Sequence, residues 1–243
     1  MSVVETPWVV RWTQPESPTL RLYCLGRAGT GATPFRPWER LVGPGVELCA
    51  VRLPGRENRV REAPLSSAAA VVEELVPVVA ADAETPFALF GHCFGALVMF
   101  ELARALRRQD LPSPVTLFVG EQIAPATVGL PGDGELTRDE LLRRLEALGG
   151  TDAKLLRSAE FLALMEPALR ADFRLADTYA YEPEPPLDTP ICVLAAADWP
   201  EIDALTAWRD ETTRAFTLRL VRGDDVLVEI GRAVAAELEL ALR

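Results

Sequence analysis

Short runs of apolar residues alternate along the chain with segments in which apolar residues recur at helical spacing. The short runs predict strands and the amphipathic segments predict helices. The predicted strands cover residues 18–26, 46–55, 87–90, 115–125, 190–198 and 216–223. The clearest predicted helices cover residues 66–80, 96–109 and 226–243. Strands that alternate with helices predict crossover connections and a mainly parallel sheet, which is an α/β fold.

Residues 126–180 interrupt this alternation, because they hold two or three amphipathic helices with no strand between them. We interpret a helical insert of that size as a lid over one end of the sheet. The proline-rich residues 181–190 are the predicted return from the insert. A length of 243 residues suits one large core, so residues 1–243 are predicted to form a single domain that contains the lid.

Composition and charge narrow the possible functions. Apolar residues make up 49% and charged residues 25%, which is typical of a soluble globular protein. The formal charge of −11 argues against nucleic acid or an anionic membrane as the main partner. We find no apolar run long enough to span a bilayer and no signal-peptide pattern, so a cytoplasmic protein with reduced thiols is expected.

The cysteines and the single histidine, His92, do not follow a metal-binding pattern. The four cysteines contain no C-x-x-C pair, so we expect neither a zinc site nor another metal or cofactor. Three of them lie in predicted strands and are interpreted as small buried hydrophobic side chains: Cys24, Cys49 and Cys192.

The fourth cysteine stands in a different context, the pentapeptide Gly-His-Cys-Phe-Gly at 91–95. It has the form G-x-nucleophile-x-G, and it lies between a predicted strand and a predicted helix, as a nucleophile elbow does. Cys93 is then the candidate nucleophile, and the backbone N–H of Phe94 is a candidate donor to an oxyanion. The alternative is a buried cysteine in a tight turn.

A second oxyanion donor is expected from the small-residue loop at 26–31, which follows the first long predicted strand. Ala28 is the best placed residue to bring a backbone N–H close to a bound carbonyl. A phosphate loop is the competing interpretation, but the pattern G-x-x-x-x-G-K-[ST] is absent. An ordinary flexible turn is the other alternative.

Several segments match a known family in order along the chain. They are Arg-Ala-Gly-Thr-Gly-Ala at 27–32, Phe-Arg-Pro-Trp at 35–38, Leu-Pro-Gly-Arg at 53–56, Gly-His-Cys-Phe-Gly-Ala at 91–96, the aspartate loop at 195–198 and the helix at 205–208. Over essentially its whole length the chain resembles the type II thioesterases of polyketide and nonribosomal peptide biosynthesis. The resemblance implies an α/β-hydrolase fold, Asp198 as the acid of a catalytic triad, and hydrolysis of acyl groups from the phosphopantetheine arm of acyl or peptidyl carrier proteins.

The chain departs from the family pattern at three positions. Cys93 stands where most members have serine, and Arg27 replaces a histidine of the oxyanion loop. In the final loop, at 221–226, the position of the triad histidine is occupied by Asp225. His92 is a poor substitute, because its side chain, next to the nucleophile, is expected to point away from the pocket. The resemblance therefore implies an atypical member without a triad histidine.

A missing histidine affects the two halves of the reaction differently. A thiol depends less on a general base than an alcohol, because a few per cent of it is thiolate at neutral pH. Hydrolysis of an acyl-cysteine, in contrast, needs an activated water, and general-base catalysis contributes about 10²–10⁴-fold. The acidic candidates are Asp198, Asp224 and Asp225, and two of them lying close together could share a proton. The alternative is that Asp224 and Asp225 are solvated loop residues.

Three functions stay open at this point. The first is acyl transfer or cyclisation through Cys93, favoured over efficient hydrolysis. The second is noncovalent acid–base chemistry, as in a cyclase, dehydratase or isomerase, and the third is noncatalytic binding of an acyl chain or a carrier protein. A cluster of basic residues could dock an acidic carrier protein or could simply be a solvated charged loop: Arg52, Arg56, Arg59 and Arg61.

Overall fold

The computed structural model describes the chain except residues 1–3, 130–131, 133, 149–157 and 242–243. Its centre is an eight-stranded sheet with the order β1-β2-β4-β3-β5-β6-β7-β8. The strands are β1 Val4–Glu5, β2 Val9–Arg11, β3 Leu20–Leu25, β4 Val46–Val51, β5 Phe87–His92, β6 Leu117–Gly120, β7 Ile191–Ala196 and β8 Phe216–Val221. All neighbouring pairs from β4 to β8 are parallel, while β1 and β2 are antiparallel additions. The predicted, mainly parallel sheet is confirmed.

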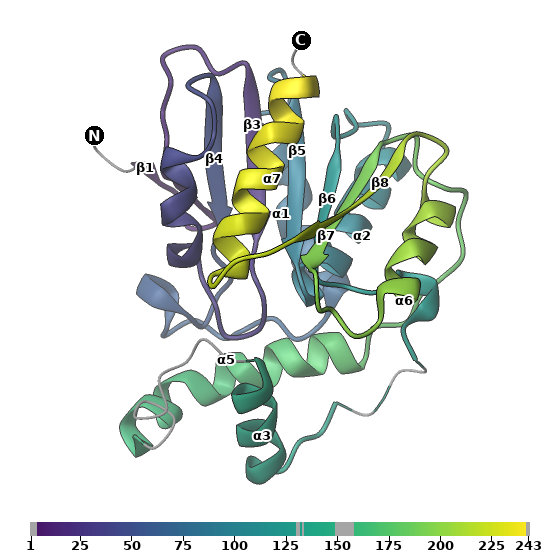
Figure 1. Ribbon diagram of the computed structural model, residues 1–243. Coiled ribbons are helices and arrows are strands. Elements are labelled where there is room, and N and C mark those ends of the chain that lie inside the picture. The colour runs from purple at the N-terminus through teal and green to yellow at the C-terminus, as the bar shows by residue number, and fades with distance from the viewer. Residues whose placement is uncertain (1–3, 130–131, 133, 149–157, 242–243) are drawn as a thin grey trace.

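Helices cover both faces of the sheet, and α7 lies in front of it in Figure 1 with α1 and α2 behind. The bounds are η1 Thr33–Arg40, η2 Glu57–Arg59, α1 Ala68–Ala80, α2 Phe94–Arg108, α6 Ile202–Thr206, η4 Ala207–Glu211 and α7 Val226–Ala241. Successive side chains of β3 enter opposite cores: Tyr23 packs in the core with α1 and α2, and Cys24 in the core with η1 and α7. Strands buried on both faces explain why the sequence shows continuous apolar runs there.

A helical segment lies along the lower edge of the sheet in Figure 1 and includes η3 Pro125–Thr127, α3 Arg138–Leu148 and α5 Ala159–Asp177. The Ser158 hydroxyl caps α5 by accepting a hydrogen bond from the Phe161 N–H at 3.3 Å. The apolar side of α5 includes Leu162, Leu169 and Phe173, all buried. Part of the predicted lid, residues 149–157, lies outside the described residues.

The carboxyl ends of the parallel strands meet at this same edge, where ligands bind in open α/β sheets. Consequently the loops that follow β3, β5, β6, β7 and β8 are neighbours in space although they are far apart in sequence. Among the described helices, none has the length and hydropathy needed to cross a membrane.

Candidate active site

The pentapeptide around Cys93 forms a sharp turn between β5 and α2. Cys93 has φ 55° and ψ −134°, a conformation that costs energy for a residue other than glycine. A Cβ added to Gly91 would lie 2.3–2.4 Å from backbone atoms of Ala96, and one on Gly95 would lie 2.6 Å from carbonyl oxygens at the end of β3. Both glycines are thus required by close backbone packing, and the turn holds the cysteine in its strained position.

The Cys93 thiol is partly buried among charged groups. Burial raises the pKa of this thiol above its ordinary value. A hydrogen bond from the Phe94 backbone N–H and the charge of Arg27 lower this pKa, whereas the charges of Glu121 and Asp172 raise it further. Because the net pKa is raised, Cys93 rests as a neutral thiol and needs a proton acceptor when it attacks.

The backbone N–H groups of the loop after β3 differ in whether they already have an acceptor. The Gly29 N–H donates to Asp172 Oδ2 at 2.8 Å, and the Thr30 N–H donates to the Arg27 carbonyl at 3.1 Å. For the Ala28 N–H, the described part of the chain provides no acceptor. The same holds for the N–H groups of Gly31 and Ala32, so the oxyanion role of Ala28 stays a prediction.

Asp172 connects helix α5 to the loop after β3 and to the Leu-Pro-Gly-Arg turn. Its two oxygens accept hydrogen bonds from Arg56 Nη2 at 2.8 Å and Nη1 at 2.9 Å, beside the one from Gly29. Arg56 Nη1 also donates to the Thr30 carbonyl at 3.1 Å. Asp172 is 0% and Arg56 2% exposed, so this is a buried ion pair with its hydrogen-bonding groups well occupied.

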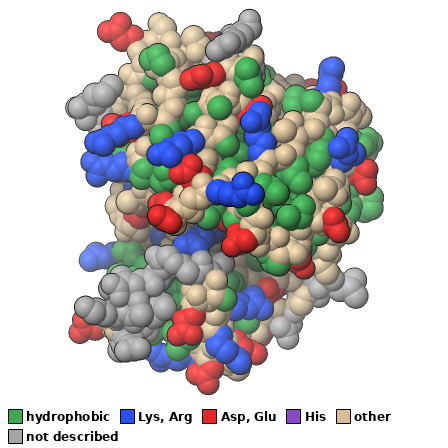
Figure 2. All heavy atoms as spheres, in the orientation of Figure 1, with side chains coloured by type: hydrophobic (Ala, Val, Ile, Leu, Met, Phe, Trp, Pro, Cys, Tyr) green, Lys and Arg blue, Asp and Glu red, His purple; other side chains and the backbone are tan. Residues whose placement is uncertain are grey.

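The predicted basic docking cluster is wrong for three of its four arginines, which are buried: Arg52, Arg56 and Arg59. The guanidinium of Arg59 pairs with Glu62 and stacks over the ring of Trp8. Only Arg61 of the four is exposed. On the face shown in Figure 2, basic and acidic side chains are interspersed and no single basic patch dominates.

Glu121 is a site residue that the sequence analysis missed. It is the first residue after β6 and has φ 49°, a left-handed conformation that disfavours a side chain. Its Oε2 lies 2.9 Å from His92 Nε2, and its Oε1 accepts the Ala196 N–H at 3.3 Å. Burial acts to raise the pKa of Glu121, but the bonds from His92 and Ala196 and the charge of Arg27 outweigh it, so the pKa is lowered.

His92, the only histidine, therefore lies against Glu121 and is itself buried. Since an ionised carboxylate can only accept, the imidazole donates its Nε2–H in this pair. The His92 side chain was expected to point away from the pocket, and the Glu121 carboxylate that it contacts was not anticipated from the sequence.

The acidic residues predicted from the final loops are exposed. Asp198 lies in the turn after β7, and Asp224 lies in the turn after β8. The Asp225 Oδ1 accepts the Val228 N–H at 3.1 Å and so caps the first turn of α7. Within the described residues no hydrogen bond or ion pair joins Asp198 to Asp225, so the hypothesis of a shared proton gains no support.

The remaining candidates for metal or thiol chemistry are buried. Cys24, Cys49 and Cys192 lie inside the cores, and burial raises the pKa of Cys192 to about 12. Across the described part of the chain, no group of three or more histidine, cysteine, aspartate or glutamate residues could hold a metal ion.

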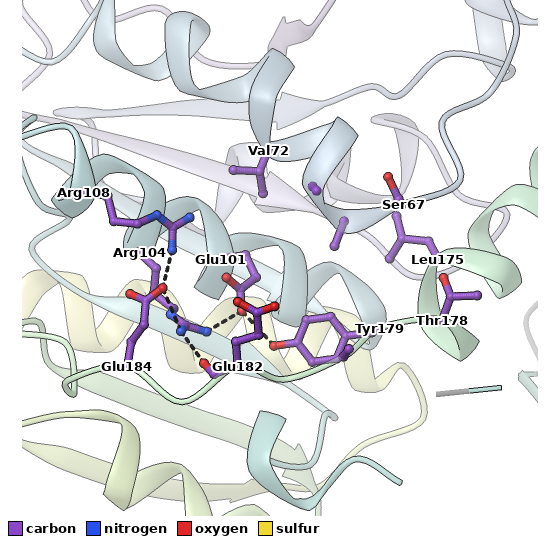
Figure 3. Close-up of a pocket in the computed structure, with 13 residues that line it drawn as sticks. Ser67, Val72, Glu101, Arg104, Arg108, Leu175, Thr178, Tyr179, Glu182 and Glu184 are labelled. Atoms are coloured by element: carbon purple, nitrogen blue, oxygen red, sulfur yellow. Dashed lines mark hydrogen bonds and ion pairs between the residues drawn. The ribbon is translucent and has the colours of Figure 1, made fainter. Parts of the chain in front are cut away.

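A cavity of about 460 Å³ lies away from the elbow, between α1, α2, the end of α5 and the return segment (Figure 3). Arg104 Nη1 and the Tyr179 hydroxyl both donate to Glu101 Oε1, at 2.7 and 2.9 Å. Glu184 binds arginines of α2, including Arg108 at 2.6 Å. The cavity wall does not include Cys93. Its charges fasten the return segment to α2.

A mainly parallel sheet covered by helices on both faces, with a sharp, strained turn between a central strand and a helix, is the arrangement of an α/β-hydrolase. The comparison with known families is more specific: residues 20–232 match the family described as "Thioesterase domain", and the chain belongs to this family. The predicted fold and the predicted enzyme class, a thioesterase-type enzyme, are thereby confirmed.

The individual relatives point the same way. The chain is 36% identical over 220 residues to the gramicidin S biosynthesis protein GrsT of Aneurinibacillus migulanus, covering 89% of this chain and 86% of that protein. It is 34% identical over 223 residues to thioesterase PikA5 of Streptomyces venezuelae, covering 89% and 78%. The solved structure of the type II thioesterase BorB from the borrelidin biosynthetic cluster matches with a TM-score of 0.86, 32% identity and 100% coverage of both chains. The resemblance to type II thioesterases is well supported, while the roles of Cys93 and Asp225 stay predictions.

Proposed function

We propose that this protein acts in polyketide or nonribosomal peptide biosynthesis on acyl chains held as phosphopantetheine thioesters by a carrier protein. In this proposal Cys93 takes up the acyl group covalently, and transfer or cyclisation is favoured over efficient hydrolysis. The observation that carries the proposal is the strained turn that presents a cysteine thiol beside the backbone N–H of Phe94. The family and the printed functions of the relatives, gramicidin S biosynthesis and the borrelidin cluster, support the class of pathway.

The first step is attack of the Cys93 sulfur on the thioester carbonyl carbon. Negative charge develops on the carbonyl oxygen, where the N–H groups of Phe94 and Ala28 can stabilise it. The Arg27 side chain adds positive charge near the sulfur. Expulsion of the pantetheine thiol leaves an acyl-cysteine, and this exchange of one thioester for another is close to balanced in energy.

Hydrolysis of that acyl-cysteine would require a base that activates water. The final loop does not offer one in the usual place, because Asp224 and Asp225 are exposed and Asp225 caps α7. General-base help of about 10²–10⁴-fold is therefore missing from the water reaction. A thiol, amine or hydroxyl of a second substrate, held against the acyl group, competes better with water under these conditions.

The test is intact-mass analysis after incubation with acylated carrier proteins, comparing wild type with Cys93→Ala. A mass gain equal to the acyl group that is absent from Cys93→Ala supports the proposal. Turnover without a mass gain, and unaffected by Cys93→Ala, would instead indicate noncovalent acid–base chemistry. Carrier binding with neither a mass gain nor turnover would indicate a binding protein.

A further inference from the structure

A neutral thiol must lose its proton as it attacks, so the proposed acyl transfer needs a proton acceptor near Cys93. Two carboxylates, those of Glu121 and Asp172, act electrostatically on this thiol. Glu121 is held next to the elbow, because the Cys93 N–H donates to the carbonyl of the preceding residue, Gly120, at 2.8 Å. They come from different elements, since Glu121 follows β6 and Asp172 belongs to α5. These two carboxylates differ in how many of their acceptor positions are already used.

Asp172 is not suited to the task. Its two oxygens already accept three hydrogen bonds, two from Arg56 and one from the Gly29 N–H, and the residue is 0% exposed. Protonation of this carboxylate would remove the partner of a buried guanidinium, which is strongly unfavourable.

Glu121 has the capacity that Asp172 lacks. A carboxylate offers about four acceptor positions, and Glu121 uses one for His92 and one for a long bond from Ala196. Its side chain is 16% exposed, so a substrate can approach it. Its left-handed backbone would suit glycine better, and strain kept at one residue beside a nucleophile is typical of functional sites.

We propose that Glu121, oriented by His92, is the proton carrier for acyl transfer at Cys93. The inference rests on the proposed function. As the Cys93 sulfur bonds to the thioester carbon, its proton passes to a Glu121 oxygen. When the carbon–sulfur bond to pantetheine breaks, the same proton passes to the departing pantetheine sulfur. The products are acyl-Cys93 and free pantetheine thiol, and Glu121 ends ionised as it began.

The surroundings of the carboxylate suit this temporary role. His92 and Arg27 keep Glu121 ionised in the resting site, so it is ready to accept a proton. The same groups make it a weak base, which favours rapid release of the proton to the more basic pantetheine thiolate. Because catalytic efficiency follows basicity, the contribution should be near the lower end of the usual range, about 10²-fold.

The decisive experiment measures two rates on Glu121→Gln. The first is acylation of Cys93 by an acyl-N-acetylcysteamine thioester, followed by intact mass, and the second is alkylation of Cys93 by iodoacetamide at neutral pH. Loss of the proton carrier should slow acylation about 10²-fold. Loss of the negative charge should lower the pKa of the thiol and so speed alkylation several-fold. A residue that only supports the fold would not move the two rates in opposite directions.

The matched control is Glu201→Gln, which removes an exposed carboxylate in the turn after β7, at the same edge of the sheet. It should leave both rates unchanged. Equal acylation by wild type and Glu121→Gln would overturn the inference, as would a parallel fall in both rates. If wild type itself is never acylated, the proposed function fails first, so the two failures are distinguishable.

His92 is a positioning residue in this scheme, and His92→Gln tests that role. A glutamine side chain can still donate to Glu121 but carries no charge at any pH. We expect this variant to retain most of the acylation rate, because the hydrogen bond to Glu121 is kept. A loss as large as that of Glu121→Gln would show that His92 does more than hold the Glu121 carboxylate in place.

Discussion

Asp172 and Glu121 are two carboxylates that act on one thiol, but their surroundings differ. Asp172 lies on the lid helix, fully buried, with a bidentate arginine and a backbone N–H filling its oxygens. Glu121 lies at the end of β6, half-buried, with one short bond from a histidine and one long bond from an N–H. The acceptor positions of Asp172 are thus largely occupied, whereas Glu121 keeps acceptor positions that no hydrogen bond uses.

This difference in hydrogen bonding distinguishes a carboxylate that stabilises the fold from one that can exchange a proton. A carboxylate whose bonds are all made cannot change its protonation state without disrupting its neighbours, so Asp172 stabilises the fold and holds the oxyanion loop. A carboxylate with open acceptor positions can take and release a proton at small cost. Number and burial of the partners, more than distance to the nucleophile, decide which role each residue has.

The largest expected effect is the loss of stability in Asp172→Ala. It leaves the Arg56 guanidinium buried without its partner, and the free energy of unfolding should fall by about 3–5 kcal/mol. Chemical denaturation measures this change. The matched control, Asp188→Ala, breaks an exposed pair with Arg214 and should leave the denaturation midpoint unchanged.

A double variant sharpens the same point. Replacing both partners with apolar residues, as in Arg56→Met with Asp172→Leu, should recover most of the stability, because no unpaired charge is left buried. The oxyanion loop would still lose the acceptor of the Gly29 N–H. If the double variant is as unstable as Asp172→Ala alone, the energy lies in packing and not in the ion pair.

The second effect concerns hydrolysis. We expect wild type to hydrolyse acyl-N-acetylcysteamine thioesters about 10³-fold more slowly than a relative with a complete triad. Asp225→His should raise this rate by up to about 10²-fold, at the expense of about 1 kcal/mol for the lost cap of α7. Hydrolysis by wild type as fast as by a triad enzyme would show that Glu121 or another group already activates water.

The third effect is the pH dependence of alkylation at Cys93. Only the thiolate reacts, and burial with the charges of Glu121 and Asp172 raises the pKa of the thiol. The rate should therefore be low at pH 7 and still increase above about pH 8.5, the ordinary thiol value. A profile that levels off below pH 7 would mean that Arg27 and the Phe94 N–H outweigh both carboxylates.

The smallest expected effect concerns the carboxylate that caps α7. Asp225→Ala removes the cap of α7 and should lower the free energy of unfolding by about 1 kcal/mol, with no change in the acylation rate. A marked fall in acylation would return Asp225 to the candidate proton carriers and weaken the assignment of Glu121.

Local patterns in the sequence were enough to predict the strands from β3 to β8 and the turn around Cys93. The glycines at 91 and 95 and the flanking apolar runs are signals that depend only on near neighbours in the chain. The short antiparallel strands β1 and β2 were missed, because two or three residues carry too little periodicity to detect.

The site was harder to predict from the sequence than the fold, because its residues pair with residues far away in the chain. Arg56 and Asp172 are 116 residues apart, and nothing near either residue reveals that they meet. For this reason a buried arginine was interpreted as part of an exposed cluster. Glu121 left a weak signal, as an acidic residue directly after a buried strand, at the edge where sites of such sheets form.

The bonds of Asp172 also couple the position of α5 to the conformation of the loop after β3. Since this residue of α5 accepts from the Gly29 N–H and from Arg56, the helix cannot shift there without changing the loop that carries Ala28. By thermodynamic linkage, any ligand that binds one position of α5 more tightly than another alters the geometry of that loop. Reciprocally, an acyl group held by the loop changes the affinity of that ligand by the same factor. The position of α5 and the conformation of the loop after β3 would then be linked by a single coupling free energy.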